Sequence, residues 1–217
     1  MLAIIPAKKK SVRLKNKNLK LFYKYPLIVH TIKSAKKSKF VKRIIVSTDS
    51  KKIAKIAKKF GAEIPFLRNR KYSKNNTTSW EVIKNVIKNL ILKEKKFYES
   101  FIYLQPTSPL RTYKDIDNAI NLFIKKKANA VVSVTKSKPN SWYKNISKKG
   151  ILINKKNDSK KNYILNGALY VFKTSYIFKS KPYTYDKKTF AYIMPEERSV
   201  DIDTINDFKS AKAIYKK

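Results

Sequence analysis

The chain has no cysteine, a single histidine and only three glycines among its 217 residues. The lack of cysteine excludes a disulfide framework and a thiolate metal site, and one histidine cannot form a histidine-based metal cluster. No apolar run approaches the ~18 residues that a transmembrane helix needs, so we expect a soluble protein with no membrane partner. The apolar start, MLAIIPA, is too short for a signal peptide and no cleavage-site pattern follows it, which favours a cytoplasmic location.

Acidic residues are also scarce, at 14 against 52 basic residues, which gives a formal net charge of +38. Such a charge suggests a polyanionic partner, either nucleic acid or a phosphate-rich substrate. The basic residues are nearly all lysine, however, whereas nucleic-acid surfaces more often use arginine for bidentate and stacking contacts. Lysine, asparagine, isoleucine and tyrosine are all abundant, which is typical of a genome that favours A and T. Nucleic-acid binding is therefore the less favoured interpretation.

Strand-like and helix-like segments alternate along the chain. The expected strands are 2–6, 42–48, 63–67, 101–104, 130–134, 165–172 and 189–193. Between them lie helical stripes at i, i+3, i+4 and i+7, such as the one from Ile53 to Phe60, which ends at Gly61. Repeated β-loop-α units predict a mostly parallel sheet covered by helices on both faces, that is, a three-layer α/β/α architecture. We see no linker that would divide the chain, so 1–217 is expected to form one domain.

This regularity lapses over about 136–162, which is polar and rich in lysine, asparagine and serine. The segment could form a lid or an arm toward a partner subunit. The alternative is a loose excursion on the surface.

Two of the scarce acids, Asp201 and Asp203, flank Ile202 in a strand-like stretch, where a period of two places both carboxylates on the same side. Two close carboxylates in so basic a chain suggest a Mg²⁺ site, because hard cations take oxygen ligands. The alternative is that Asp203 caps the last helix while Asp201 pairs with a lysine.

The first strand runs directly into a basic loop from Lys8 to Lys17, followed by Asn18. Loops of this kind at a strand end commonly hold the phosphates of a nucleotide, although a solvated lysine run would look the same. Gln105–Arg111 (QPTSPLR) follows another strand at the end where open α/β sheets bind ligands, or is simply a proline turn. His30 lies within a helix pattern and is expected to be structural.

Taken together, these stretches resemble the acylneuraminate cytidylyltransferase family, the CMP-sialic acid synthetases. The resemblance rests on an ordered set of motifs across nearly the whole chain: IIPA…S…LKNKN, IIVSTDS, the Arg68 loop, LQPTSPLR, NGALYVF and ERSVDIDTINDF. It implies a Rossmann-like nucleotidyltransferase fold, a homodimer with 136–162 as its dimerisation arm, and transfer of CMP from CTP to a nine-carbon α-keto acid sugar (a nonulosonic acid) with Mg²⁺ as cofactor.

The resemblance also implies roles for particular residues. Lys17, Asp201 and Asp203 are expected to be catalytic, with the two aspartates as Mg²⁺ ligands. The expected nucleotide-binding residues are Ala7, Lys8, Ser11, Asn18, Arg68, Thr77 and Ser79. The expected sugar-binding residues are Gln105, Asn166 and Gly167.

The chain departs from the family pattern at several of these positions. Lys8 replaces an arginine and loses its bidentate fork, and Asn75 stands where an aspartate is common. Lys10 replaces a glycine, which would add strain if the position needs φ > 0. These departures leave open a related substrate (a legionaminic, pseudaminic or Kdo-type acid) and a non-catalytic, nucleotide-binding paralogue.

Overall fold

The computed structural model describes residues 1–137, 145–146, 152–153, 163–179 and 185–215. The strands are β1 (Leu2–Pro6), β2 (Leu21–Phe22), β3 (Tyr25–Pro26), β4 (Arg43–Ser47), β5 (Ser100–Leu104), β6 (Ala130–Lys136), β7 (Asn145–Ile146), β8 (Leu152–Ile153), β9 (Tyr163–Lys173) and β10 (Thr189–Ile193). The α-helices are α1 (Leu27–Lys37), α2 (Lys51–Lys59), α3 (Ser79–Glu94), α4 (Tyr113–Lys125), α5 (Thr174–Lys179) and α6 (Ile205–Tyr215). Short 3-10 helices cover Lys17–Leu19 (η1), Arg70–Ser73 (η2) and Glu196–Arg198 (η4).

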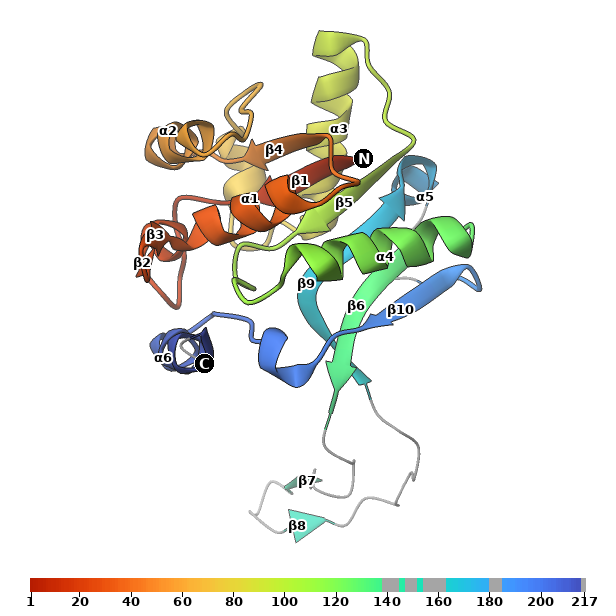
Figure 1. The fold of residues 1–217 in the computed structure, drawn as a ribbon. Coiled ribbons are helices and arrows are strands. Elements are labelled where there is room, and N and C mark those ends of the chain that lie inside the picture. The colour runs from red at the N-terminus through yellow and green to blue at the C-terminus, as the bar shows by residue number, and fades with distance from the viewer. Residues whose placement is uncertain (138–144, 147–151, 154–162, 180–184, 216–217) are drawn as a thin grey trace.

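A six-stranded sheet in the order β10-β6-β9-β5-β1-β4 forms the centre of the fold (Figure 1). β1 pairs in parallel with β4 and β5, and β6 pairs in parallel with β10. β9 is antiparallel to both of its neighbours, β5 and β6. The predicted α/β class with a mostly parallel sheet is confirmed. The reversal of β9 was not predicted, because the apolar pattern of a strand indicates which faces are buried and not the direction in which it runs.

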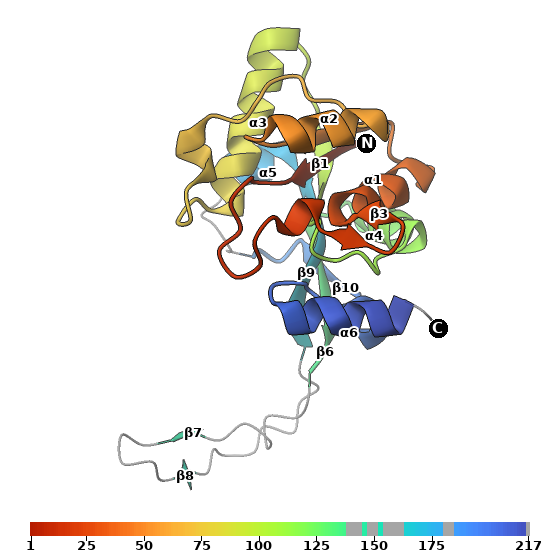
Figure 2. The same ribbon diagram turned by 90° about the vertical axis from the view of Figure 1, so that its left-hand side faces the viewer.

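Helices cover both faces of this sheet, as Figure 2 shows with the sheet nearly edge-on. On β1, Ala3 and Ile5 belong to the apolar cluster that includes residues of α1, α2 and α4, whereas Leu2 and Ile4 belong to the cluster under α3 and α5. This alternation follows from the period of two in a strand. A third apolar cluster lies beneath α6 and includes Phe22 and Phe208.

One of the expected strands, 63–67, and the strand-like character of the stretch around Ile202 are wrong in the structure. The segment 63–67 makes a single parallel bridge, from Glu63 to Ile45, because Pro65 has no N–H to donate to a ladder. The stretch around Ile202 forms no strand and lies outside the sheet, with the Ile202 N–H donating to Thr107 O at 2.8 Å. Ile202 is nevertheless fully buried, so its apolar character correctly predicted which residue faces inward.

Most of the predicted arm at 136–162 lies outside the described residues. Within it, β7 and β8 pair as a short antiparallel ladder. Among the described helices, none is long and apolar enough to cross a membrane.

A buried carboxylate, Asp115 on α4, ties this helix to the segment that leads toward the C-terminus. Its oxygens accept hydrogen bonds from Arg198 Nε (3.1 Å) and Nη2 (3.0 Å) and from the Tyr192 hydroxyl (3.0 Å). They also accept the Thr112 N–H at 2.9 Å, which caps α4. Burial alone would raise the pKa of Asp115, but the bonds from Arg198 and Thr112 outweigh it and lower the pKa below 3.8.

We therefore expect Asp115→Asn to lower the free energy of unfolding by about 2 kcal/mol, because it removes a buried charge partner of Arg198. Urea unfolding would measure the change. Glu197→Gln is the matched control, since Glu197 meets the same guanidinium at 3.5 Å from an exposed position. That control should change stability by about 0.5 kcal/mol or less. Equal losses in both variants would contradict the special role of Asp115.

Comparing the wild type with Asp115→Asn at different pH values tests the lowered pKa of Asp115. A carboxyl whose pKa is lowered in the folded state contributes stability above its unfolded pKa, and this contribution is lost as the pH falls through the folded pKa. The stability difference between the wild type and Asp115→Asn should therefore be full above pH 3.8 and shrink below it.

Candidate active site

A cavity of about 350 Å³ opens where the carboxyl ends of β1 and β5 meet. The predicted site residues that line it are Lys8, Ser11, Lys17, Asn18, Arg68, Thr77, Ser79, Gln105 and Asp203. The structure thus brings together side chains that are up to nearly 200 positions apart in the sequence. Ala7, Asp201, Asn166 and Gly167 are not among the lining residues.

The conformation of the basic loop that follows β1 is fixed by hydrogen bonds at both of its ends. The Ala7 N–H donates to Ser47 O at 2.8 Å, so the loop leaves the sheet in register with β4. The buried side chain of Asn18 donates to Lys8 O at 3.1 Å and so links the two ends of the loop. Asn16 supplies the left-handed turn, with φ of 55°, a conformation that asparagine tolerates better than most residues. Ala7 and Asn18 therefore shape the loop that faces the cavity.

Two of the departures from the family pattern have a structural outcome. Lys10 is exposed and is not among the residues with positive φ, so the strain expected from replacing glycine does not arise. Lys8 Nζ donates to Asn75 Oδ1 at 3.2 Å, so the lysine that replaces arginine meets the asparagine that replaces aspartate.

Arg68 has the least satisfied environment in the cavity wall. Only 5% of this residue is exposed, yet its Nε and Nη2 atoms have no hydrogen-bond partner. Its backbone N–H donates to Thr48 O at 2.8 Å, which fixes the residue beside the end of β4. Burial lowers the pKa of Arg68, with the charge of Asp49 opposing the shift. A buried guanidinium with free donors is costly unless a ligand binds it.

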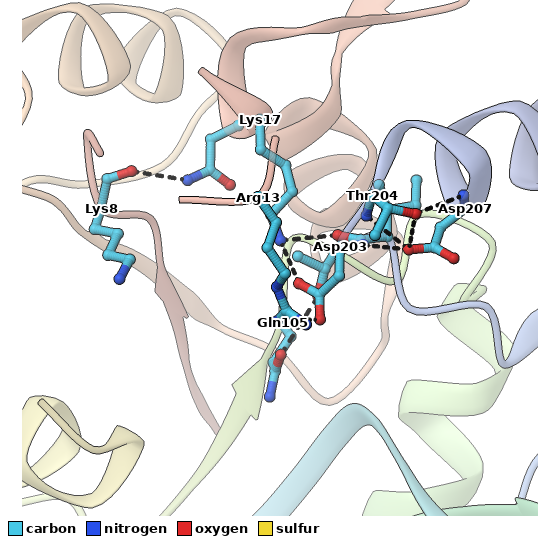
Figure 3. Close-up of polar contacts among 10 residues, drawn as sticks. Lys8, Arg13, Lys17, Gln105, Asp203, Thr204 and Asp207 are labelled. Carbon is cyan, nitrogen blue, oxygen red and sulfur yellow. Dashed lines mark hydrogen bonds and ion pairs between the residues drawn. The ribbon is translucent and has the colours of Figure 1, made fainter. Parts of the chain in front are cut away.

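Elsewhere in the cavity lining, the carboxylate of Asp203 accepts hydrogen bonds from two cationic side chains. Lys17 Nζ donates to Asp203 Oδ1 at 2.8 Å and Arg13 Nη2 donates to Asp203 Oδ2 at 2.6 Å, as Figure 3 shows. Lys17 also donates to Ile202 O at 2.8 Å and is largely buried. The first loop and the C-terminal segment are thereby joined at the mouth of the cavity.

Asp203 does not cap the last helix, so that alternative is excluded. The cap of α6 is formed by Thr204 and Asp207: the Asp207 N–H donates to Thr204 Oγ1 at 3.2 Å, and Asp207 Oδ2 accepts from the Thr204 N–H at 2.7 Å. Asp207 also accepts the N–H of Asp203 itself, at 3.0 Å. The carboxylate of Asp203 is thus left to face the cavity.

Asp201 lies nearby and is hydrogen-bonded to Thr107, a cavity residue. Although its side chain reaches solvent, the protein around it displaces water and raises its pKa, and the charge of Asp203 raises it further. Lys17 and Arg13 act in the opposite direction. Two carboxylates that interact in this way are suitable oxygen donors for Mg²⁺, which commonly takes one or two carboxylates and completes its shell with substrate phosphates and water. The described residues include no cluster of three or more acids or histidines, so a substrate would have to supply the remaining ligands.

The far end of the cavity is built around Gln105. Gly167 has φ of 72°, which favours glycine, whereas a Cβ added there would meet the Gln105 amide at 3.6–3.7 Å, an ordinary contact distance, so glycine is needed for the backbone conformation and not for space. Asn166 is buried, with Oδ1 accepting from Ser133 Oγ at 2.6 Å and Nδ2 donating to Ser199 Oγ at 2.9 Å. Its amide is thus already bonded, and a direct contact with sugar stays a prediction.

Two functional features were missed from the sequence. Arg13, which lines the cavity and binds Asp203, could have been singled out as the one arginine in a loop of lysines. Arg111 is fully buried and donates to Gln105 O at 3.1 Å and to Thr31 Oγ1 at 2.9 Å. The sequence suggests that Arg111, together with Gln105, supplies polar recognition in the QPTSPLR stretch. In the structure Arg111 instead supports Gln105 from behind. Burial lowers the pKa of Arg111 to about 10.

The charge around the cavity is strongly unbalanced. Its lining includes five cationic side chains, Lys8, Arg13, Lys17, Arg68 and Lys74, and one acid, Asp203. A polar, cationic cavity at the carboxyl ends of parallel strands is suited to an anion of several charges.

Comparison with known proteins agrees with this geometry. The chain is 36% identical over 222 residues to the CMP-N,N'-diacetyllegionaminic acid synthase of Legionella pneumophila, covering 96% of this chain and 93% of that protein. It is 34% identical over 226 residues to the N-acylneuraminate cytidylyltransferase of Escherichia coli O18:K1:H7, of which it spans about half, 52% of the length. A solved CMP:2-keto-3-deoxy-manno-octonic acid synthetase in complex with CTP shares the fold, with a TM-score of 0.74 at 14% identity over 99% of this chain and 98% of that chain.

The model of the family described as cytidylyltransferase matches residues 2–217, which is nearly the whole sequence. With this match and relatives above 30% identity, the chain belongs to the cytidylyltransferase family.

Proposed function

We propose that this protein transfers CMP from CTP to the anomeric hydroxyl of a nonulosonic acid and releases pyrophosphate. The observation that carries the proposal is the buried guanidinium of Arg68, which presents unpaired donors in a cavity lined by five cations. CTP offers acceptors on its base and up to four negative charges on its phosphates. The names of the related proteins support the same chemistry.

The two walls of the cavity suggest where each part of CTP would lie. Arg68, Thr77 and Ser79 lie together on the side of η2 and α3 and would contact the cytidine. Lys8 and Lys17 lie on the loop after β1 and would neutralise the phosphates. Because phosphoryl-type transfer depends mainly on positioning and charge neutralisation, a rigid loop of this kind supplies most of what the reaction needs.

Asp201 and Asp203 would hold Mg²⁺, whose chemistry is to neutralise charge on the phosphates and on the leaving pyrophosphate. Lys17 keeps the Asp203 carboxylate in place through Oδ1, while its second bond to Ile202 O fixes the lysine itself. The sugar would lie beside Gln105, with Gly167 shaping the wall behind it.

The reaction forms a bond between the anomeric oxygen and the α-phosphorus and breaks the bond from that phosphorus to the β-phosphate oxygen. The proton of the sugar hydroxyl must leave during the attack. A carboxylate at the Asp201–Asp203 pair, or a water that it orients, is placed to accept the proton.

The first test is pyrophosphate release from CTP with Mg²⁺ across a panel of nonulosonic acids: N-acetylneuraminic, N,N'-diacetyllegionaminic, pseudaminic and Kdo. We expect turnover with one of the nine-carbon acids. Asp203→Asn should reduce turnover by about 10³-fold or more while leaving the unfolding transition in place, since it removes a metal ligand. Turnover of that variant close to wild type would remove the metal role. CTP binding with no turnover on any sugar would indicate a non-catalytic paralogue.

Arg68 offers a separate prediction that joins stability to function. We expect Arg68→Met to lower CTP affinity by about tenfold or more, and to raise the free energy of unfolding of the ligand-free protein by about 1 kcal/mol, because it replaces a buried, unsatisfied charge by an apolar chain of similar length. Isothermal titration and urea unfolding measure the two quantities. The control is Arg70→Met, two residues away and exposed. A loss of stability with unchanged CTP affinity would mean that Arg68 is structural.

We further propose that the protein is a cytoplasmic homodimer, with 136–162 as the arm. The described residues that lead out of this segment, Tyr163, Ile164 and Leu165, are 40%, 52% and 45% exposed, which is unusual for three consecutive apolar residues of one strand. A second copy would cover them. Light scattering should give a dimeric mass for the wild type and a monomeric mass for Ile164→Lys/Leu165→Lys; a monomeric wild type would contradict the proposal.

A further inference from the structure

We infer that Arg13 competes with the divalent cation for Asp203, so that the metal site of the ligand-free protein is closed by its own guanidinium. The inference rests on the proposed function, since it assumes that Asp203 binds a metal. It goes beyond that function by assigning to Arg13 a control over when the metal binds.

The first step is that the two oxygens of Asp203 are held differently. Lys17 occupies Oδ1 at 2.8 Å, and Arg13 occupies Oδ2 at 2.6 Å. A divalent cation binds carboxylate oxygens directly, so at Oδ2 it would meet the guanidinium at hydrogen-bond distance and the two positive charges would repel each other. Metal binding is therefore favoured when one of the two protein cations moves away.

The second step is that the two cations differ in how firmly they are anchored. The Lys17 side chain is 13% exposed and has a second bond, to Ile202 O at 2.8 Å. The Arg13 side chain is 66% exposed, and within the described ranges its hydrogen-bonded partner is Asp203 alone. Exposed ion pairs contribute little and exchange readily, so Arg13 is the group that leaves.

The third step concerns where the released guanidinium finds a partner. Arg13 lines the same cavity as Lys8 and Ser11, on the loop assigned to the phosphates. A guanidinium matches phosphate oxygens with two parallel bonds. A metal that arrives with a triphosphate therefore brings a replacement partner for Arg13, whereas a bare metal ion does not. The arrangement favours metal bound together with nucleotide over metal alone.

The test measures Mn²⁺ binding by the electron paramagnetic resonance signal of the free ion, first without nucleotide and then with CTP. Wild type, Arg13→Ala, Asp203→Asn and Lys209→Ala are compared. Lys209 is the control for a generic loss of one positive charge, since it is exposed on α6, close in the sequence to Asp203.

Without nucleotide, Arg13→Ala should bind Mn²⁺ about fivefold more tightly than wild type, as expected when an exposed competing charge is removed. CTP should increase Mn²⁺ affinity less in this variant than in wild type, because no guanidinium remains to be transferred. Lys209→Ala should behave as wild type, and Asp203→Asn should lose the site.

Equal Mn²⁺ affinity of wild type and Arg13→Ala, or the same gain in Lys209→Ala, would overturn the inference. So would wild-type Mn²⁺ binding by Asp203→Asn. The first two results would leave the proposed function in place, and the third would also remove Asp203 from the proposed metal site. The proposed transfer of CMP fails instead if the wild type releases no pyrophosphate from CTP with any sugar of the panel.

Discussion

The carboxylate of Asp203 joins the two ends of the chain at the cavity mouth. Through Lys17 and Arg13 it connects residues that are 186 and 190 positions apart. This contact lies where the sheet places the ends of β1 and β5, so the loop after β1 is closed by a segment that the chain reaches last. The cavity therefore exists only in the completed fold, and each half of its wall depends on the other.

Several hydrogen bonds and a buried side chain fix the position of the C-terminal segment that carries Asp203. Ile202 is buried between the two aspartates and bonded to Thr107, while Asp207 caps α6 and also binds the Asp203 N–H. Upstream, Arg198 is held by the buried Asp115 of α4. Acids are scarce in this chain, and Asp115, Asp203 and Asp207 each accept hydrogen bonds from backbone or guanidinium donors. The geometry of the site therefore depends on a few well-bonded acids, and the many lysines contribute little to it.

Much of this could be predicted from the sequence, for reasons that are visible in particular residues. The apolar stripe from Ile53 to Phe60 marked α2, and the continuous apolar run of β1 marked a buried strand. Direction and pairing could not be predicted, because they depend on distant partners: β9 is antiparallel, and the segment after Glu63 does not join the sheet. For the same reason the role of Asn166, bonded to Ser133 and Ser199, could not be separated from sugar contact.

The arginines show how composition and function are reconciled at a net charge of +38. Of the six arginines, Arg13 binds Asp203, Arg43 joins Glu63 to Glu94, Arg111 is buried behind Gln105, and Arg198 binds Asp115. Arg68 presents its free donors to the cavity. Arg43, Arg111 and Arg198 each make several directed bonds from one planar group, which lysine cannot supply. Lysine has spread over the surface, where a charge needs no fixed geometry, and arginine persists where the fold or the site requires one. The net charge is therefore better explained by composition than by a nucleic-acid partner, and the charge that matters for function is confined to one cavity.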